Sequence, residues 1–147
     1  SAAASGSVNP DSDAHAIARA LRSADVRPDD VTMIVPHGVG ASLLDRYEAE
    51  ALAEVFGAGG SDWPSFLPLK GAVGHTLGGC ALVETVGALL ALEHEQLPAA
   101  ASVDTFDPAL PLGRSSRRVD GGRWTLLKCV NGFGGQNGAF VLRSIAR

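Results

Sequence analysis

The most apolar stretch of the chain runs from Gly71 to Leu92 and is interrupted by His75 and Glu84. Its second part, Gly78 to Leu92, predicts a helix that is apolar enough to be buried. The two interruptions and the many glycines argue against a membrane span. A helix of this kind indicates a fold built in layers around it.

His75 stands just before that helix, and Lys70 precedes it. Unpaired backbone N–H groups and the positive end of the helix dipole point toward this position, so an anion can be held there and an imidazole tends to stay neutral. The position of His75 therefore favours a catalytic site. A histidine that only caps a core helix is the alternative, and this stretch by itself leaves both open.

The composition fits one α/β domain with its own core. The chain has 147 residues, of which 46% are apolar and 19% charged. A net charge of -4 and a pI near 5.4 argue against a nucleic-acid partner. Cys80 and Cys129 lie in apolar runs without metal-ligand spacing, so we expect core packing, no metal site and a reducing, cytoplasmic compartment.

The rest of the chain alternates between helices and strands and ends in two strands. This order predicts a layered α/β half-structure with a closing antiparallel pair. The predicted elements are an arm over 1–9, a helix from Pro10 that stops near Arg27, a strand from Thr32 to Pro36, a helix from a capping Ser42 to Gly57, a strand from Phe66 to Leu69, the helix Gly78 to Leu92, a loop from Gln96 to Gly122, and strands from Trp124 to Asn131 and from Ala139 to Leu142.

A second histidine, His37, follows the predicted strand directly. Open α/β sheets place their sites at the carboxyl ends of strands. Asp45 and Glu48 lie three positions apart near the positive end of the next helix, so they share a face. The two histidines, with Lys70 between them, are a plausible oxyanion and acid/base set.

Three motifs agree in order and interval: HGVGASLLDRYE from His37, KGAVGH from Lys70, and NGFGGQN from Asn131. In these motifs the chain resembles the C-terminal half of a β-ketoacyl-acyl-carrier-protein synthase, a ketosynthase of the thiolase-like superfamily. The resemblance covers nearly the whole chain. It implies a thiolase-like layered αβαβα fold, in which 1–147 form the C-terminal domain and 1–9 an N-terminal arm.

The resemblance also implies roles for individual residues. His37 and His75 would face a cysteine nucleophile and support decarboxylation of a malonyl-carrier thioester. Lys70 would hold His75 in place, with Glu48 as its ion-pair partner and Asp45 as a supporting charge. These roles describe a catalytic centre without a metal.

The glycine-rich turn corresponds to a further part of the family's site. Phe133 matches an aromatic gate on the acyl pocket, with core packing as its alternative. Gly134 and Gly135 would let that loop move or let its backbone N–H groups meet the thioester carbonyl. Asn131 stands where an aromatic residue is common, and Asn137 is expected to fix the turn.

The chain departs from the family's pattern in two further places. The family's nucleophilic cysteine lies in its N-terminal half, and neither Cys80 nor Cys129 has that position. Val39 and Ala41 replace two hydroxyl residues that bind the phosphopantetheine arm in the family, which removes about two hydrogen bonds. These differences argue against a standard fatty-acid role and favour a specialised relative, such as a ketosynthase of polyketide biosynthesis or its partner.

We therefore expect a ketosynthase subunit for decarboxylative Claisen condensation or a related acyl transfer, inactive as this chain alone. A non-catalytic partner resembling a chain-length factor is the alternative, and a free-standing metabolite-binding domain is a third possibility. The expected partners are a complementary N-terminal chain with the cysteine, an acyl carrier protein with its phosphopantetheine arm, and a second ketosynthase unit. We expect no bound cofactor, no nucleic acid and no membrane, and an apolar surface on the helix Gly78 to Leu92 that needs cover.

Overall fold

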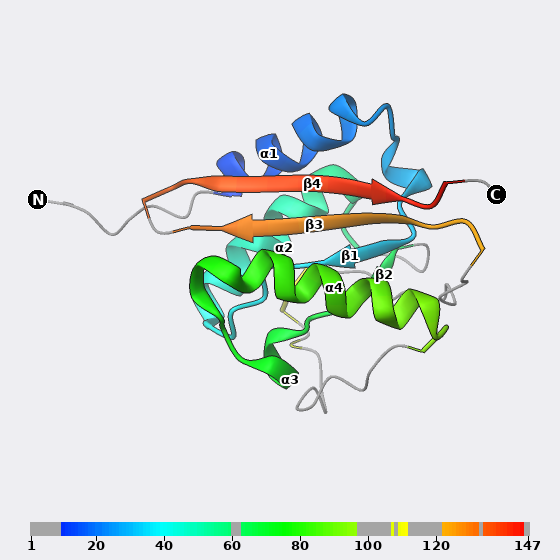
Figure 1. Ribbon diagram of the computed structural model, residues 1–147. Coiled ribbons are helices and arrows are strands. Elements are labelled where there is room, and N and C mark those ends of the chain that lie inside the picture. Colours follow the sequence, from blue (N-terminus) through cyan, green and yellow to red (C-terminus); the bar gives the residue numbers. More distant parts are fainter. Residues whose placement is uncertain are drawn as a thin grey trace, which may run out of the picture.

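The computed structural model describes residues 10–59, 63–96, 107, 109–111, 122–132 and 134–145. The described residues form a four-stranded mixed sheet with helices on both faces (Figure 1). The predicted arm over 1–9 and most of the loop from Gln96 to Gly122 lie outside the described residues.

The sheet has the strand order β2-β1-β3-β4. Its strands are β1 (Met33–Val35), β2 (Ser65–Phe66), β3 (Thr125–Asn131) and β4 (Asn137–Arg143). Strand β1 runs parallel to β2 and β3, whereas β3 and β4 are antiparallel, with Asn131 opposite Asn137 at their hairpin. The predicted closing antiparallel pair is therefore confirmed.

Helices α1 (Pro10–Ser23) and α2 (Ser42–Phe56) cover one face of the sheet, and α4 (Cys80–Glu93) covers the other (Figure 1). Short helical turns complete the set: η1 (Pro28–Asp30), α3 (Lys70–Val73) and η2 (Leu77–Gly79). Because strand side chains alternate between faces, Ile34 and Leu127 pack toward α1 and α2, while Val35 and Leu126 pack toward α4. This alternation fixes which strand residues reach the site.

Several predicted boundaries differ from the structure. The first helix ends at Ser23 instead of near Arg27, because Asp25 takes the left-handed conformation at φ +52, which aspartate tolerates better than most residues. Ser42 begins α2 and makes no capping bond, since the capping position belongs to Ala41. Gly57, at φ +86, ends α2 as predicted.

The segment before α4 also differs from the prediction. Strand β2 ends at Phe66 rather than Leu69, since Pro68 has no N–H for a sheet bond and Leu69 already has helical backbone angles. Helix α4 starts at Cys80, after η2, rather than at Gly78. The four residues of α3 form a helix that the sequence analysis did not predict.

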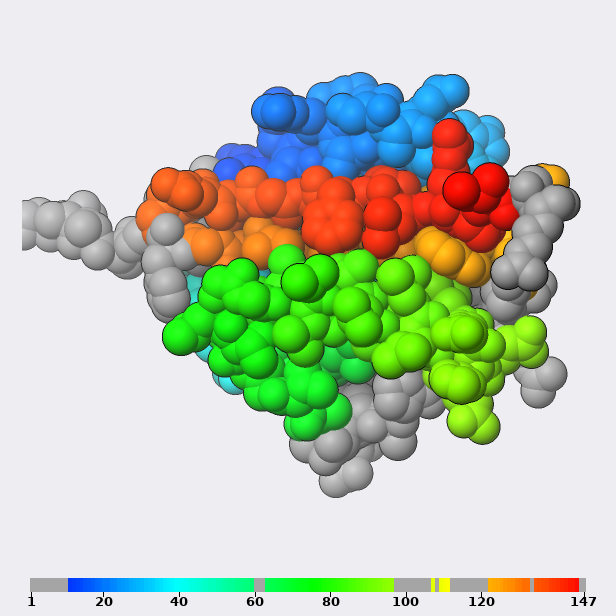
Figure 2. All heavy atoms as spheres, in the orientation of Figure 1, coloured from blue at the N-terminus to red at the C-terminus, as the bar shows by residue number. Residues whose placement is uncertain are grey.

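Helix α4 is buried on one side only. Figure 2 shows this helix, in green, on the surface of the molecule beside the last two strands. Six large apolar side chains of α3, η2 and α4 are 42–74% exposed: Val73, Leu77, Leu82, Val83, Val86 and Leu90. The predicted uncovered apolar surface is confirmed. No helix in the described part of the chain is long and apolar enough to cross a membrane.

Candidate active site

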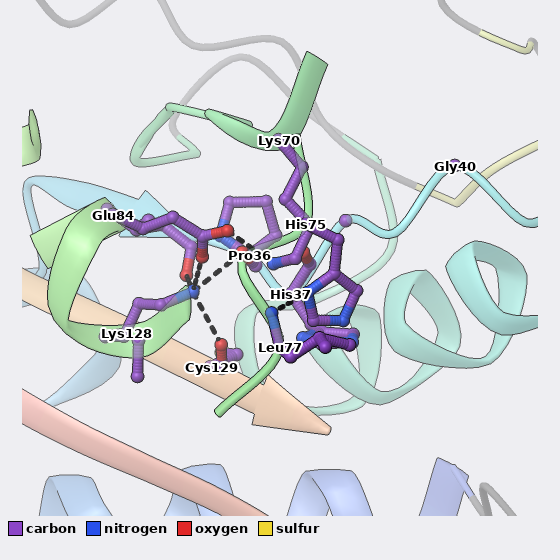
Figure 3. A network of polar contacts seen from close by, with 12 residues as sticks. Pro36, His37, Gly40, Lys70, His75, Leu77, Glu84, Lys128 and Cys129 are labelled. Carbon is purple, nitrogen blue, oxygen red and sulfur yellow. Dashed lines mark hydrogen bonds and ion pairs between the residues drawn. The ribbon is translucent and has the colours of Figure 1, made fainter. Parts of the chain in front are cut away.

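His37 and His75 meet at one end of the sheet. Their ring centroids are 5.5 Å apart and their planes form an angle of 81°, an edge-to-face arrangement (Figure 3). His37 follows the last residue of β1, and His75 lies between α3 and η2. The predicted convergence of the two imidazoles is therefore present in the structure.

The loop that carries His37 is held from α2 by two carboxylates. Glu48 accepts hydrogen bonds from the peptide N–H groups of His37 at 2.6 Å and of Gly38 at 2.8 Å. Asp45 accepts one from the N–H of Gly40 at 3.2 Å. The predicted shared face of Asp45 and Glu48 thus binds the backbone around His37.

The predicted ion pair between Lys70 and Glu48 is wrong. Lys70 pairs with Glu84 instead, with its Nζ 2.5 Å from Oε1, and it also donates a hydrogen bond to the carbonyl oxygen of His37. The carboxylate of Glu48 is already used by two peptide N–H groups, whereas Glu84 projects from the buried side of α4. Lys70 therefore connects α4 to the backbone of His37.

Lys128 is a second lysine of this network, and the sequence analysis missed it. Its Nζ lies 2.5 Å from Oε2 of Glu84, so one carboxylate receives two ammonium groups (Figure 3). Glu84 and Lys128 both break otherwise apolar elements, and this shared anomaly was the available signal. Together with Lys70 they form a buried triad at the end of β1.

Burial, the ammonium groups of Lys70 and Lys128, and the ring of His75 lower the pKa of His37 from 6.5 to about 4, with burial as the largest cause. His37 is therefore neutral near pH 7. Its Nδ1 is buried and has no hydrogen-bond partner among the described residues. A neutral, poorly solvated ring is a suitable donor or acceptor for a substrate.

The ring of His75 is oriented by its own turn. Its Nδ1 accepts a hydrogen bond from the peptide N–H of Leu77 at 3.1 Å. Since an accepting nitrogen carries no proton, the neutral ring carries its proton on Nε2. His75 thus offers an N–H donor.

Burial also raises the pKa of the two supporting carboxyl groups. The pKa of Glu48 rises to about 7, although the N–H groups of Gly38 and His37 oppose the rise. The pKa of Asp45 rises because of burial, with the N–H of Gly40 as the first opposing contact. The stability of the folded state therefore depends on pH through the ionisation of Glu48 and Asp45.

A cavity of about 390 Å³ opens between the two histidines and the β3–β4 hairpin. Its lining is mainly apolar and consists of His37, Val39, Leu44, His75, Leu77, Gly78, Cys80, Ala81, Val130, Asn131 and Gly132. Of the candidate site residues outside the histidines, Val39 and Asn131 line it, whereas Ala41, Gly134 and Gly135 are not among its lining residues. Cys80, interpreted as core, lies at the cavity and is 5% exposed.

The hairpin loop is only partly described. Gly134 and Gly135 adopt left-handed angles of +88° and +74°, which explains why glycine is needed at both. Phe133, the predicted gate, lies outside the described residues. Asn131 is anchored to α1, because its Nδ2 donates to Asp13 at 3.0 Å. Asp13 is a buried supporting residue that the sequence analysis did not identify.

Comparison with known proteins gives the same family on sequence and on structure. The family described as "Beta-ketoacyl synthase, C-terminal domain" matches residues 2–104. The ketoacyl synthase beta subunit of the tetracenomycin polyketide synthase from Streptomyces glaucescens is 38% identical over 145 residues, which is 94% of this chain and 33% of the relative. The alpha subunit of the same synthase is 34% identical over 134 residues, which is 88% of this chain and 30% of the relative.

A solved complex of a type II polyketide synthase acyl-carrier protein with its ketosynthase, AntDE:AntF, contains a similar chain. The TM-score is 0.76 at 26% identity, over 95% of this chain and 34% of the other. This chain thus spans about a third of the length of each of these three relatives. The fold is the C-terminal half of the thiolase-like layered fold, and the chain belongs to the β-ketoacyl synthase family.

Proposed function

We propose that this chain supplies the histidine half of a ketosynthase active site for polyketide-type biosynthesis. The reaction is a decarboxylative Claisen condensation, or a related acyl transfer, on carrier-protein thioesters. The observation that carries the proposal is the edge-to-face pair of His37 and His75 beside an apolar cavity. The similarity to the alpha subunit of a polyketide ketoacyl synthase, at 34% identity, also supports it.

The chemistry needs a thiolate nucleophile and hydrogen-bond donors for an anionic oxygen. The thiolate takes an acyl group from its carrier thioester. A malonyl-type thioester then loses carbon dioxide, and the electron pair of the broken bond forms an enolate. The enolate carbon attacks the acyl thioester, a carbon–carbon bond forms, and the thiolate leaves.

In this scheme the two imidazoles stabilise the enolate oxygen. His75 donates through Nε2–H, the tautomer that its bond from Leu77 favours. His37 stays neutral because it is buried beside two ammonium groups. Lys70 positions His37 by binding its carbonyl oxygen and Glu84, and it moves no proton. Phe133 as an acyl-pocket gate remains a prediction.

The nucleophilic cysteine comes from outside these 147 residues in this proposal. Burial raises the pKa of Cys129 well above its ordinary value, which disfavours the thiolate that the reaction needs. Cys80 follows His75 in the chain and lies in the first turn of α4. A complementary ketosynthase half brings the cysteine and covers the exposed side of α4, and a second ketosynthase unit completes the dimer.

The substrate arrives on the phosphopantetheine arm of an acyl carrier protein. The complex AntDE:AntF, in which a carrier protein is bound to its ketosynthase, supports this choice of partner. Val39 lines the cavity where the family resemblance implies a hydroxyl, so the arm loses a hydrogen bond there. No further cofactor takes part in the proposed reaction.

A non-catalytic partner role, like that of a chain-length factor, is the second candidate. Val39 and Ala41, which lack the hydroxyls of the family pattern, favour it. The similarity to a beta subunit, at 38% identity, also favours it. The two candidates differ in whether the histidines of this chain are needed for product formation.

The deciding experiment compares His37→Ala and His75→Ala with the unsubstituted protein in its purified assembly. Each assembly is incubated with acyl- and malonyl-carrier substrates, and intact-mass analysis follows both the acyl adduct and the product. The catalytic proposal expects product formation to fall by roughly 100-fold or more in each variant. His15→Ala, on the exposed side of α1, is the control. Unchanged product formation in both site variants selects the partner role, and the absence of any cysteine adduct rejects the enzyme.

A further inference from the structure

Lys128 is a fully buried lysine in the middle of an apolar strand. Its exposed fraction is 0%, and its strand neighbours are leucines, cysteine and valine. An ammonium in such surroundings is tolerated only when its N–H groups find acceptors. Lys128 finds them in Glu84 at 2.5 Å, in the carbonyl of Cys129 at 2.8 Å and in the carbonyl of Pro36 at 3.0 Å, with Val35 further away at 3.4 Å.

These contacts place the ammonium at the end of β1. Lys128 is the register partner of Val35, and its side chain follows Leu126 on the α4 face of β3. It reaches the carbonyls just before His37, while Lys70 takes the carbonyl of His37 itself. Two lysines from distant segments therefore hold consecutive carbonyls around the histidine (Figure 3).

The network carries more positive than negative charge. Glu84 offers one oxygen to each lysine, so a single carboxylate faces two ammonium groups. Glu48, the other buried carboxyl group nearby, is bound to peptide N–H groups and has a pKa raised to about 7 by burial. The charged and titratable groups that act on the ring of His37 are Lys70, Lys128, His75 and Glu84.

We propose that Lys128 is a positioning residue of this site. It fixes the backbone that leads into His37, and as the second ammonium on Glu84 it leaves a positive charge that opposes protonation of His37 and favours negative charge in the cavity. The effect on condensation rests on the proposed function, whereas the effect on the imidazole does not.

The first test measures the protonation of His37 directly. The chain contains four histidines, so ring-¹³C labelling gives a small set of signals in the assembled protein, and His37→Gln identifies the one that belongs to His37. In the unsubstituted protein His37 should titrate near 4, far below the ordinary 6.5. In Lys128→Met the pKa of His37 should rise toward 6.5. Arg46→Met, which removes an exposed cation on α2, should leave it unchanged.

A loosened core alone would also raise this pKa, because water would reach the ring. Lys128→Arg separates the two causes, since it keeps the charge while it changes the packing. We expect the arginine variant to keep the pKa of His37 close to that of the unsubstituted protein. An equal rise in the arginine and methionine variants overturns the proposal, and so does an unchanged pKa in Lys128→Met. If the methionine variant does not fold, Lys128→Gln, whose amide still donates to the carbonyls, replaces it.

The second test uses the condensation rate as a function of pH. In Lys128→Met, kcat should fall and the acid limb of the profile should move up with the pKa of His37, while KM for the carrier substrate stays the same. A change in KM alone contradicts a positioning role at the histidine. If the unsubstituted assembly shows no condensation, the proposed function fails, and the titration of His37 still decides the role of Lys128.

Discussion

Glu48 holds His37 by its backbone and not by its ring. Its Oε1 accepts the peptide N–H of His37 at 2.6 Å, and its Oε2 accepts that of Gly38 at 2.8 Å. The side chain is buried, and burial raises its pKa from 4.5 to about 7. The loop that positions the histidine is therefore attached to a carboxyl group whose ionisation weakens the folded state.

This relationship predicts a pH-dependent effect of Glu48→Gln. A folded pKa above the unfolded value means that the folded state binds more protons between about 4.5 and about 7, so the contribution of Glu48 to stability falls as the pH rises through that range. Glutamine cannot ionise. The free energy of unfolding of the unsubstituted protein, minus that of the variant, should therefore decrease with rising pH.

Urea unfolding at several pH values across that window measures the difference. His37 titrates in both proteins, so its own opposite contribution largely cancels. A difference that is constant or increases with pH would contradict a raised pKa for Glu48.

The sequence predicted the two histidines of the candidate site better than it predicted the residues that hold them in place. His37 and His75 were identifiable because three motifs agree in order and because strand ends gather at one edge of a parallel sheet. The partner of Lys70 was not, since Glu48 and Glu84 are both carboxylates on helices beside the site, and only the fold shows that peptide N–H groups occupy Glu48. Lys128 needed the register of β3 against β1 before its role was visible.

The secondary structure, too, was predicted in some elements and missed in others. Long elements with a clear apolar period, such as α2 and the two last strands, were predicted, whereas α3 was not, because four residues with a glycine among them carry no period. The bond between Asp13 and Asn131 joins the first helix to the third strand, and local sequence patterns cannot reveal such a contact.

The second prediction concerns the free energy of unfolding, and it follows from the carboxylate of Glu84 that two lysines share. Glu84→Gln leaves the ammonium groups of Lys70 and Lys128 buried without a counter-charge, and breaking a buried ion pair in this way costs about 3 to 5 kcal/mol. Arg46→Ala breaks an exposed pair with Glu50 and should cost at most about 1 kcal/mol. Chemical unfolding of both variants at neutral pH gives the comparison, and equal costs would mean that the triad is not buried as described.

The third prediction concerns the tautomer of His75. Because Nδ1 accepts the N–H of Leu77 at 3.1 Å, the neutral ring should carry its proton on Nε2. A long-range ¹H–¹⁵N correlation spectrum of the histidine rings distinguishes the two tautomers. His15, which is exposed on α1, serves as the reference for an unrestrained ring. A proton found on Nδ1 of His75 would remove the donor that the proposed chemistry assigns to this ring.

The fourth prediction concerns the uncovered side of α4. Leu82 is 71% exposed on that side, in a group of large apolar side chains of the kind that marks an interaction surface. Leu82→Asp should leave the secondary structure unchanged, since the side chain is mostly exposed, but it should place a charge inside the proposed interface with the complementary ketosynthase half.

Size-exclusion chromatography with light scattering measures the outcome. The unsubstituted chain should elute with its companion as a complex, and Leu82→Asp should release it as a smaller species or reduce the amount of complex. Ile145→Asp is the matched control, because Ile145 is also apolar and is 91% exposed, but it follows β4 and belongs to none of the elements that carry the apolar group. A complex that survives Leu82→Asp as well as it survives Ile145→Asp would show that the companion binds elsewhere, and the cysteine would then have to reach His37 and His75 by another route.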